Sequence, residues 1–206
     1  MDNQLLSLPH DEHHNSLPDR SRVLFLDING VLDSPAWYKR ENDRIFAQTG
    51  VRKPLVDVLD PTSIKLLDNI IERTNASIVI TSAWREHYGL DGTVARLEDA
   101  GFNYLEHVIG CTGNVHEGQS GRGKEVLEWL EQRPGITHWC VVDDYRFDIP
   151  KSNKFDFSNR IQITNGAIGL TARDVEIIVR VLTIGSRFPV RNQDTNAQPP
   201  RTTRSA

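Results

Sequence analysis

The chain has 206 residues, of which 38% are hydrophobic, so it can form one domain with a full core or at most a domain with small insertions. Its formal net charge of -4 gives no general attraction to nucleic acid or anionic membranes, although a local basic groove is compatible with it. No apolar run approaches the roughly 20 residues that span a bilayer, and the start of the chain has no signal-peptide core, so we expect a cytoplasmic protein without membrane contact.

The two ends of the chain differ in composition from the rest. Residues 1–20 and 188–206 are polar and contain almost nothing that a core could bury. Such segments cannot offset the entropy of ordering, so we expect both to be disordered tails. This leaves residues 21–187 as a single domain.

Within this domain, short runs rich in Val and Ile predict buried parallel strands. In chain order they are RVLFLD (22–27), SIVIT (77–81), HVIGC (107–111), HWCVVD (138–143) and RIQIT (160–164). Helical patterns lie between them. One begins at Asp60-Pro61, a second follows Gly121, and a third opens on a capping-box variant from Thr171 to Asp174. Strands and helices in alternation predict an α/β fold with a doubly wound, Rossmann-like parallel sheet.

Polar side chains follow the predicted strands at the sheet edge where ligands bind in such folds. They are Asp27 after the first strand, Thr81 and Ser82 at the second, and Asp143, Asp144 and Asp148 at the fourth, with Arg122 and Lys124 opening the helix before the fourth. Together they supply a carboxylate nucleophile, a hydroxyl donor, a cation and acids that can hold Mg²⁺. The set indicates phosphoryl transfer.

The motifs resemble those of the haloacid dehalogenase (HAD) superfamily. Asp27-Ile-Asn-Gly-Val-Leu32 is similar to its nucleophile signature, Ile78-Val-Ile-Thr81 to its second motif, and the stretch from Val141 to Asp148 to its acidic fourth motif. More narrowly, Thr81-Ser-Ala-Trp-Arg85, the stretch from Arg122 to Trp129 and Gly169-Leu-Thr171 resemble the small HAD domains of Swiss-army-knife RNA-repair proteins. The similarity spans roughly residues 22 to 183.

The resemblance implies a role for each polar residue. Asp27 attacks phosphorus and forms an aspartyl-phosphate, and Thr81, beside Ser82, donates to a phosphoryl oxygen. Mg²⁺ is expected on Asp27, the backbone carbonyl of Asn29 and an acid of the 143–144 pair, with Asp144 the leading ligand and Asp148 a further acid. Either Arg122 or Lys124 offsets the charge, and Arg85 follows a strand end where phosphate is expected.

Asn29 departs from this pattern. In HAD phosphatases the acid two positions after the nucleophile protonates the leaving oxygen and then activates water, and an amide can do neither. Losing such catalysis costs about 10²–10⁴-fold in rate. Three explanations stay open: a poor phosphatase or a catalytically silent pseudoenzyme that binds a phosphorylated partner, a phosphotransfer or lyase-like step, or an engineered replacement that traps an intermediate.

The substrate prediction depends on the insert between the first strand and the first predicted helix. Roughly residues 34 to 57 are available for it, which predicts a capless protein or a small cap. An open site admits macromolecular phosphates, so we expect a nucleic-acid end or a nucleotide phosphate. The insert is both basic and aromatic, which suits base stacking and phosphate pairing, although an ordinary helix with a charged face gives the same pattern. Its residues of this kind are Trp37, Tyr38, Lys39, Arg40, Arg44, Phe46, Arg52 and Lys53.

Overall fold

The computed structural model describes residues 17–52, 55–113 and 121–184. Most of the two predicted tails, residues 1–16 and 188–206, lies outside these ranges, as does Lys53 of the insert. The last residues of the predicted N-terminal tail are nevertheless structured. The first strand begins at Asp19, because the backbone N–H of Asp19 donates to the Asn75 carbonyl at 2.8 Å and extends the strand backwards.

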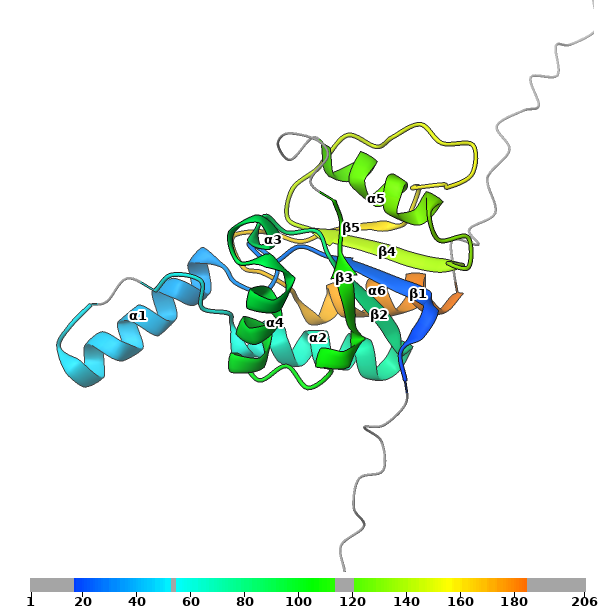
Figure 1. Cartoon of the computed structure of the whole chain (residues 1–206). Coiled ribbons are helices and arrows are strands. Elements are labelled where there is room, and N and C mark those ends of the chain that lie inside the picture. Colours follow the sequence, from blue (N-terminus) through cyan, green and yellow to red (C-terminus); the bar gives the residue numbers. More distant parts are fainter. Residues whose placement is uncertain (1–16, 53–54, 114–120, 185–206) are drawn as a thin grey trace, which may run out of the picture.

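A five-stranded sheet forms the centre of the domain (Figure 1). Its strands are β1 (Asp19–Leu26), β2 (Ala76–Ile80), β3 (Val108–Cys111), β4 (His138–Asp143) and β5 (Ile161–Ile163). They lie in the order β3-β2-β1-β4-β5 and every neighbouring pair is parallel. The predicted doubly wound α/β fold is therefore confirmed.

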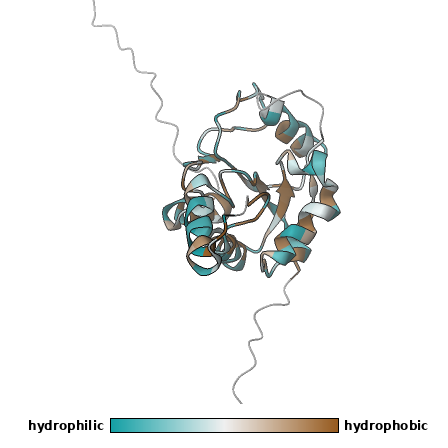
Figure 2. Ribbon diagram, turned by 90° about the vertical axis from the view of Figure 1, so that its left-hand side faces the viewer, coloured by the Kyte–Doolittle hydropathy of each residue, from teal (hydrophilic) through white to brown (hydrophobic). Residues whose placement is uncertain are grey.

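Helices cover both faces of this sheet. Alternate residues of β1 point to opposite faces, so Leu24 and Leu26 belong to one core cluster and Val23 and Phe25 to the other. The first cluster packs under α2 (Pro61–Thr74), α4 (Gly89–Asp99) and α6 (Ala172–Ile184), and the second under α5 (Arg122–Glu131). The apolar strands thus lie between helices whose outer surfaces are polar (Figure 2). The short helices α3 (Trp84–His87) and η2 (Leu105–His107) flank α4.

The predicted helix starts are found where the sequence placed them. The Asp60 side chain caps α2 by accepting from the backbone N–H of Thr62 at 2.8 Å, and Pro61 follows it. Before α6, the Asp174 carboxylate accepts from the backbone N–H of Thr171 at 2.9 Å, and the Thr171 hydroxyl accepts from the N–H of Asp174 at 3.4 Å. These reciprocal bonds fix the point where the chain leaves the β5 loop and enters α6.

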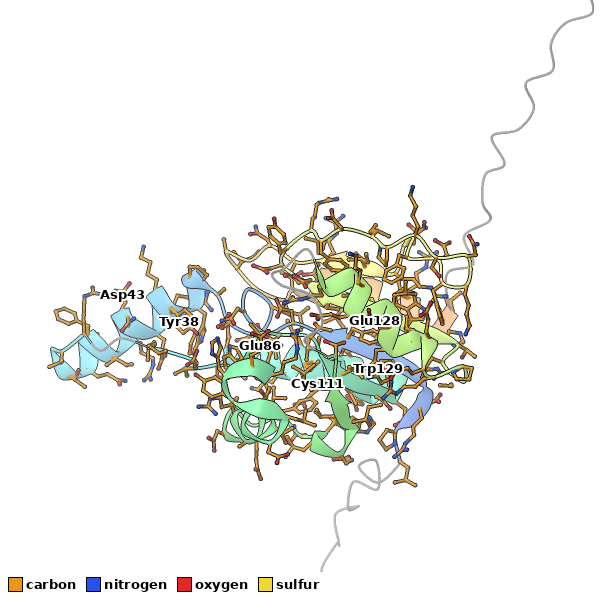
Figure 3. The ribbon with its side chains drawn as sticks, turned by 45° about the horizontal axis from the view of Figure 1, so that its top comes forward. Tyr38, Asp43, Glu86, Cys111, Glu128 and Trp129 are labelled. Carbon is orange, nitrogen blue, oxygen red and sulfur yellow. The ribbon has the colours of Figure 1, made fainter. Side chains whose placement is uncertain are left out.

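The predicted insert contains one helix, α1 (Pro35–Thr49), which extends from the body as an arm (Figure 1). Ser34 caps its start by accepting from the Trp37 N–H at 3.2 Å, and Gly50 ends it with φ 71°. Tyr38 lies on the part near the body and Asp43 farther out (Figure 3). Across the described residues, no helix combines the length and apolar character needed to cross a membrane.

The two cysteines provide a check on the packing of β4. Cys140 is fully buried in this strand, and burial raises the pKa of its thiol to about 12, whereas Cys111 at the end of β3 is partly exposed. We expect a maleimide at pH 8 to label Cys111 alone in the native protein and both thiols in denaturant, because the thiolate is the reactive form. Mass spectrometry counts the labels. Rapid native labelling of Cys140 contradicts this packing.

Candidate active site

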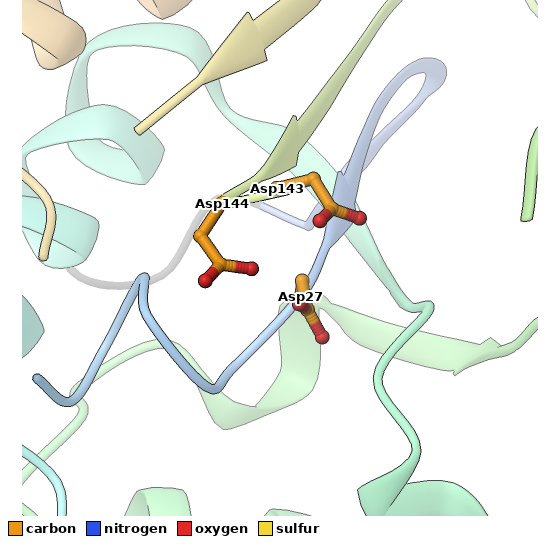
Figure 4. Close-up of side chains that lie close together, drawn as sticks. All are labelled: Asp27, Asp143 and Asp144. Atoms are coloured by element: carbon orange, nitrogen blue, oxygen red, sulfur yellow. The ribbon is translucent and has the colours of Figure 1, made fainter. Parts of the chain in front are cut away.

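The site forms where the direction of chain progression through the sheet reverses, between β1 and β4. Asp27 follows β1 directly, and its backbone N–H donates to the Val142 carbonyl at 3.0 Å. This bond holds the two strand ends together. Carboxylate oxygens of Asp27, Asp143 and Asp144 consequently lie within 4.8 Å of one another (Figure 4).

Arg122, the first residue of α5, supplies the cation at this cluster. Its Nη1 lies 3.0 Å from Asp27 Oδ2 and also donates to Asp143 Oδ2. The Arg122 side chain is only 9% exposed, so the interaction is poorly screened by water. Burial lowers the pKa of Arg122, but the two carboxylates more than offset this and raise it. Lys124, the other predicted cation, has an exposed side chain on the same helix.

The acids of the cluster carry more negative charge than Arg122 neutralises. Burial raises the pKa of Asp143 to about 6, with a further increase from Asp27, although Arg122 and the Tyr145 N–H oppose it. The pKa of Asp144 is raised as well, first by burial and then by Asp27. Raised carboxyl pKa values at a buried cluster indicate that the ionised groups would be stabilised by another positive charge.

These residues fit a magnesium ion. All three donors are carboxylates, the hard oxygen ligands that Mg²⁺ prefers, and each has an oxygen within 4.8 Å of the other two. Among the described residues, the converging set consists of Asp27, Asp143 and Asp144. Asp148 lies outside it, exposed in the loop after β4. The predicted ligand role of the Asn29 carbonyl stays a prediction.

Thr81 lies at the end of the neighbouring strand β2. Its backbone N–H donates to the Leu26 carbonyl at 2.9 Å, which places it beside the start of the Asp27 segment. Its side chain is fully buried, and Thr81 Oγ1 has no hydrogen-bond partner among the residues described. A buried hydroxyl without a partner is unfavourable unless a ligand supplies one. Ser82 is also buried, but its hydroxyl accepts weakly from the Trp84 N–H at 3.4 Å.

Arg85 is held by protein groups. Its Nη2 lies 2.8 Å from Glu125 Oε2, and its Nη1 donates to the carbonyls of Thr81 and Ser82. The side chains of Arg85 and Glu125 are 7% and 3% exposed, so this is a buried ion pair. It connects the end of β2 to α5, the helix that carries Arg122. These bonds support the end of β2 at Thr81, while Arg85 Nε has no hydrogen-bond partner among the described residues, so the phosphate contact suggested for Arg85 stays a prediction.

Asn29 is exposed and is bonded to Asp33, a carboxylate with no predicted role in the site. Its Nδ2 donates to Asp33 Oδ2 at 3.0 Å. Asp33 also accepts from the Gly30 N–H at 2.7 Å and from the Tyr38 hydroxyl at 2.9 Å. Burial raises the pKa of Asp33, against the effect of these three donors, and burial together with Asp33 raises that of Tyr38. Asp33 thus fixes the amide of Asn29 and ties it to α1.

The basic residues of the insert are mostly paired with acids. Arg40 Nη2 lies 3.3 Å from Asp60 Oδ2, and Arg44 binds Glu41. Arg52 Nη2 lies 3.0 Å from Asp43 Oδ1, and its guanidinium also stacks on Phe46. Residues of α1, the 57–62 connection and the end of α4 line a cavity of about 760 Å³, whose lining does not include the three acids of the cluster. The insert therefore presents a mixed-charge surface.

Comparison with known proteins identifies one family. A family model described as the HAD domain in Swiss Army Knife RNA repair proteins matches residues 23–175, which span every strand end of the site. No curated protein and no solved structure matches the chain.

Proposed function

Because the chain belongs to the family of HAD domains in Swiss Army Knife RNA repair proteins, we propose that it is a Mg²⁺-dependent phosphatase acting on a nucleic-acid end or nucleotide phosphate. Family membership supports HAD-type hydrolase or phosphatase chemistry in general. One observation carries the finer proposal. Asp27 lies in a three-carboxylate cluster with a guanidinium nitrogen 3.0 Å from its Oδ2.

In the proposed reaction, an Asp27 oxygen attacks phosphorus, the Asp27–phosphorus bond forms, and the bond to the leaving oxygen breaks. Thr81 donates its unpartnered hydroxyl to a phosphoryl oxygen, and Arg122 offsets the charge that accumulates. Water then hydrolyses the aspartyl-phosphate and regenerates Asp27. Asp27, Asp143 and Asp144 would hold Mg²⁺, which would supply electrostatic stabilisation of the phosphoryl oxygens.

Two features support a nucleic-acid substrate. The matched family is described by its occurrence in RNA repair proteins. In addition, Tyr145 directly follows Asp144 and is 51% exposed. Its backbone N–H donates to Asp143 Oδ1 at 2.8 Å, which holds this residue beside the cluster. An exposed aromatic ring next to a phosphate site can stack on a base with little sequence preference. Arg40 and Arg44 of α1 are weaker support for a nucleic-acid substrate, because both already pair with carboxylates.

The second candidate function is a catalytically silent HAD domain that binds a phosphorylated partner. The amide of Asn29 favours it, because this side chain cannot transfer a proton and is held by Asp33. Both candidates share the phosphate and metal sites. They differ only in whether the leaving group departs.

Thermal melting tests the site itself. At a Mg²⁺ concentration ten times the dissociation constant, binding raises the free energy of unfolding by about 1.4 kcal/mol. This raises Tm by about 3–6 °C in a domain of this size. Beryllium fluoride, a phosphate mimic, is expected to add a further increase that Asp27→Asn abolishes. Asp144→Asn is expected to lose the Mg²⁺ shift, whereas its matched control Asp148→Asn keeps it, since Asp148 lies outside the cluster. The absence of any Mg²⁺ shift in the wild-type protein contradicts the metal assignment.

A further inference from the structure

The loop after β5 contacts the site, although no motif had predicted a role for it. The Thr164 N–H donates to the Asp143 carbonyl at 2.9 Å, and its hydroxyl donates to the Gly30 carbonyl at 2.9 Å. Farther along, the Ala36 N–H donates to the Ala167 carbonyl at 3.2 Å. These bonds hold residues 164–167 against the segment that follows the nucleophile and against the end of β4.

Two glycines of these segments lie against the Asp144 carboxylate. A Cβ on either Gly30 or Gly166 would lie less than 3.0 Å from Asp144 Oδ2, and Cβ atoms in proteins essentially never come so close to a non-bonded atom. A Cβ on Gly166 would also lie 3.2 Å from the Cβ and Cγ of Asp144. Asp144 therefore occupies a space that exists only because both positions lack side chains.

The two glycines differ in backbone conformation. Gly30 has φ 69°, in the left-handed region where a side chain is strained whatever the space around it. Gly166 is not among the glycines with positive φ, so its φ does not itself require glycine. What excludes a side chain at position 166 is the neighbouring carboxylate, and this makes Gly166 the cleaner probe of the space.

We propose that Gly166 is a positioning residue for the metal site: the absence of a side chain there lets the Asp144 carboxylate turn toward Asp27 and Asp143. A methyl group at 166 would push the end of a flexible side chain, because the nearest atom is a carboxylate oxygen. The displacement would therefore fall on the donor set and leave the backbone in place. This inference rests on the proposed binding of Mg²⁺ at the cluster.

Calorimetric titration of the full chain with MgCl₂ alone tests the inference without any activity assay. Gly166→Ala is expected to weaken Mg²⁺ binding about tenfold or more, the loss typical of groups that orient metal ligands. Its metal-free Tm is expected to stay within about 3 °C of the wild-type value, because the methyl group displaces a side-chain end and not the backbone, and alanine lowers the entropy of the unfolded chain by a comparable amount. The matched control is Gly135→Ala, where a Cβ meets nothing within 4 Å, and it is expected to bind Mg²⁺ like the wild type.

The outcomes separate this inference from the proposed function. If the wild-type protein binds no Mg²⁺, the metal site itself is wrong. If the wild type binds and Gly166→Ala binds equally well, the positioning role is overturned while the metal site stands. Should Gly166→Ala fail to fold, the double variant with Asp144→Ala decides: recovery of folding supports the collision with Asp144, and failure to recover overturns it.

Discussion

Asn29→Asp is expected to raise the turnover of an aryl phosphate at least about tenfold in the presence of Mg²⁺, because it restores a proton donor and acceptor beside Asp27. The change keeps the size of the side chain. Acid–base catalysis contributes about 10²–10⁴-fold in general, and the smaller gain of about tenfold is the minimum expected here because an aryl leaving group needs little protonation. Steady-state release of the aryl alcohol measures the gain.

The leaving group shows which step Asn29 impairs. If protonation of the leaving oxygen is missing, an alkyl phosphate or a 3′-phosphorylated oligonucleotide should gain more than the aryl ester. An equal gain on all substrates places the defect in hydrolysis of the aspartyl-phosphate, which they share. Adding Asp27→Asn to Asn29→Asp is expected to return activity to background, because the restored acid has no nucleophile to assist.

Asp33 makes this substitution costly for stability. The Asn29 Nδ2 lies 3.0 Å from Asp33 Oδ2, so Asn29→Asp places two carboxylates together and replaces attraction by repulsion. The exchanged pair, Asn29→Asp with Asp33→Asn, restores one donor and one acceptor and should recover the lost Tm while keeping the activity gain. No gain in either variant, with Mg²⁺ binding intact, excludes the impaired-phosphatase proposal and leaves the phosphate-binding protein.

Glu125→Gln is expected to destabilise the protein by about 3 kcal/mol, since it leaves the buried Arg85 guanidinium with only the more distant Glu86 carboxylate, 3.8 Å from Nη2, as a counter-charge. The substitution preserves size and one hydrogen-bond acceptor, so the loss reports the charge. Urea unfolding followed by tryptophan fluorescence measures it. Glu131→Gln, at an exposed position of the same helix, is the matched control and should change stability by less than about 0.5 kcal/mol.

The partner substitution completes this test. In an Arg85→Met background the guanidinium is gone, so adding Glu125→Gln should no longer destabilise and should recover part of the loss. Equal effects of Glu125→Gln in the two backgrounds would show that Arg85 is not what makes Glu125 important. Its importance would then come from other contacts, of which the hydrogen bond from the Thr112 hydroxyl to Glu125 Oε2 at 3.3 Å is one.

The sequence predicted the parts of the site that depend on strand order. Asp27, Thr81 and Asp143 each follow or end an apolar run, and parallel strands bring such ends to one edge whatever the loops do. It also narrowed the cation to two residues of one helix start, and the structure places Arg122 on the carboxylates. The positions of the strand ends can be read from the sequence because burial requires a run of apolar residues in each strand.

Other features depend on contacts that a linear pattern does not contain. Arg85 follows a strand end just as a phosphate ligand would, but its partner Glu125 is 40 residues away on a helix whose rotation the sequence leaves open. Asp33 lies in a turn that follows apolar residues, and nothing in the sequence marks it. Its role in holding Asn29 is seen only from the three hydrogen bonds that it accepts in the structure. Gly166 carries no signal at all, because its importance is the space it leaves.

The central position of β1 has a consequence for how the protein is made. Leu24 pairs with Ile78 on one side and with Cys140 on the other, so the strand that precedes Asp27 needs partners from both halves of the chain. During synthesis from the N-terminus, β1 and β2 can associate long before β4 leaves the ribosome, and one edge of β1 then lacks its neighbour. An unpaired apolar edge is where a nascent chain aggregates, and here it closes only when the strand bearing Asp143 arrives. The pairing that closes this edge also brings Asp143 and Asp144 to Asp27, so the last step in completing the sheet completes the carboxylate cluster.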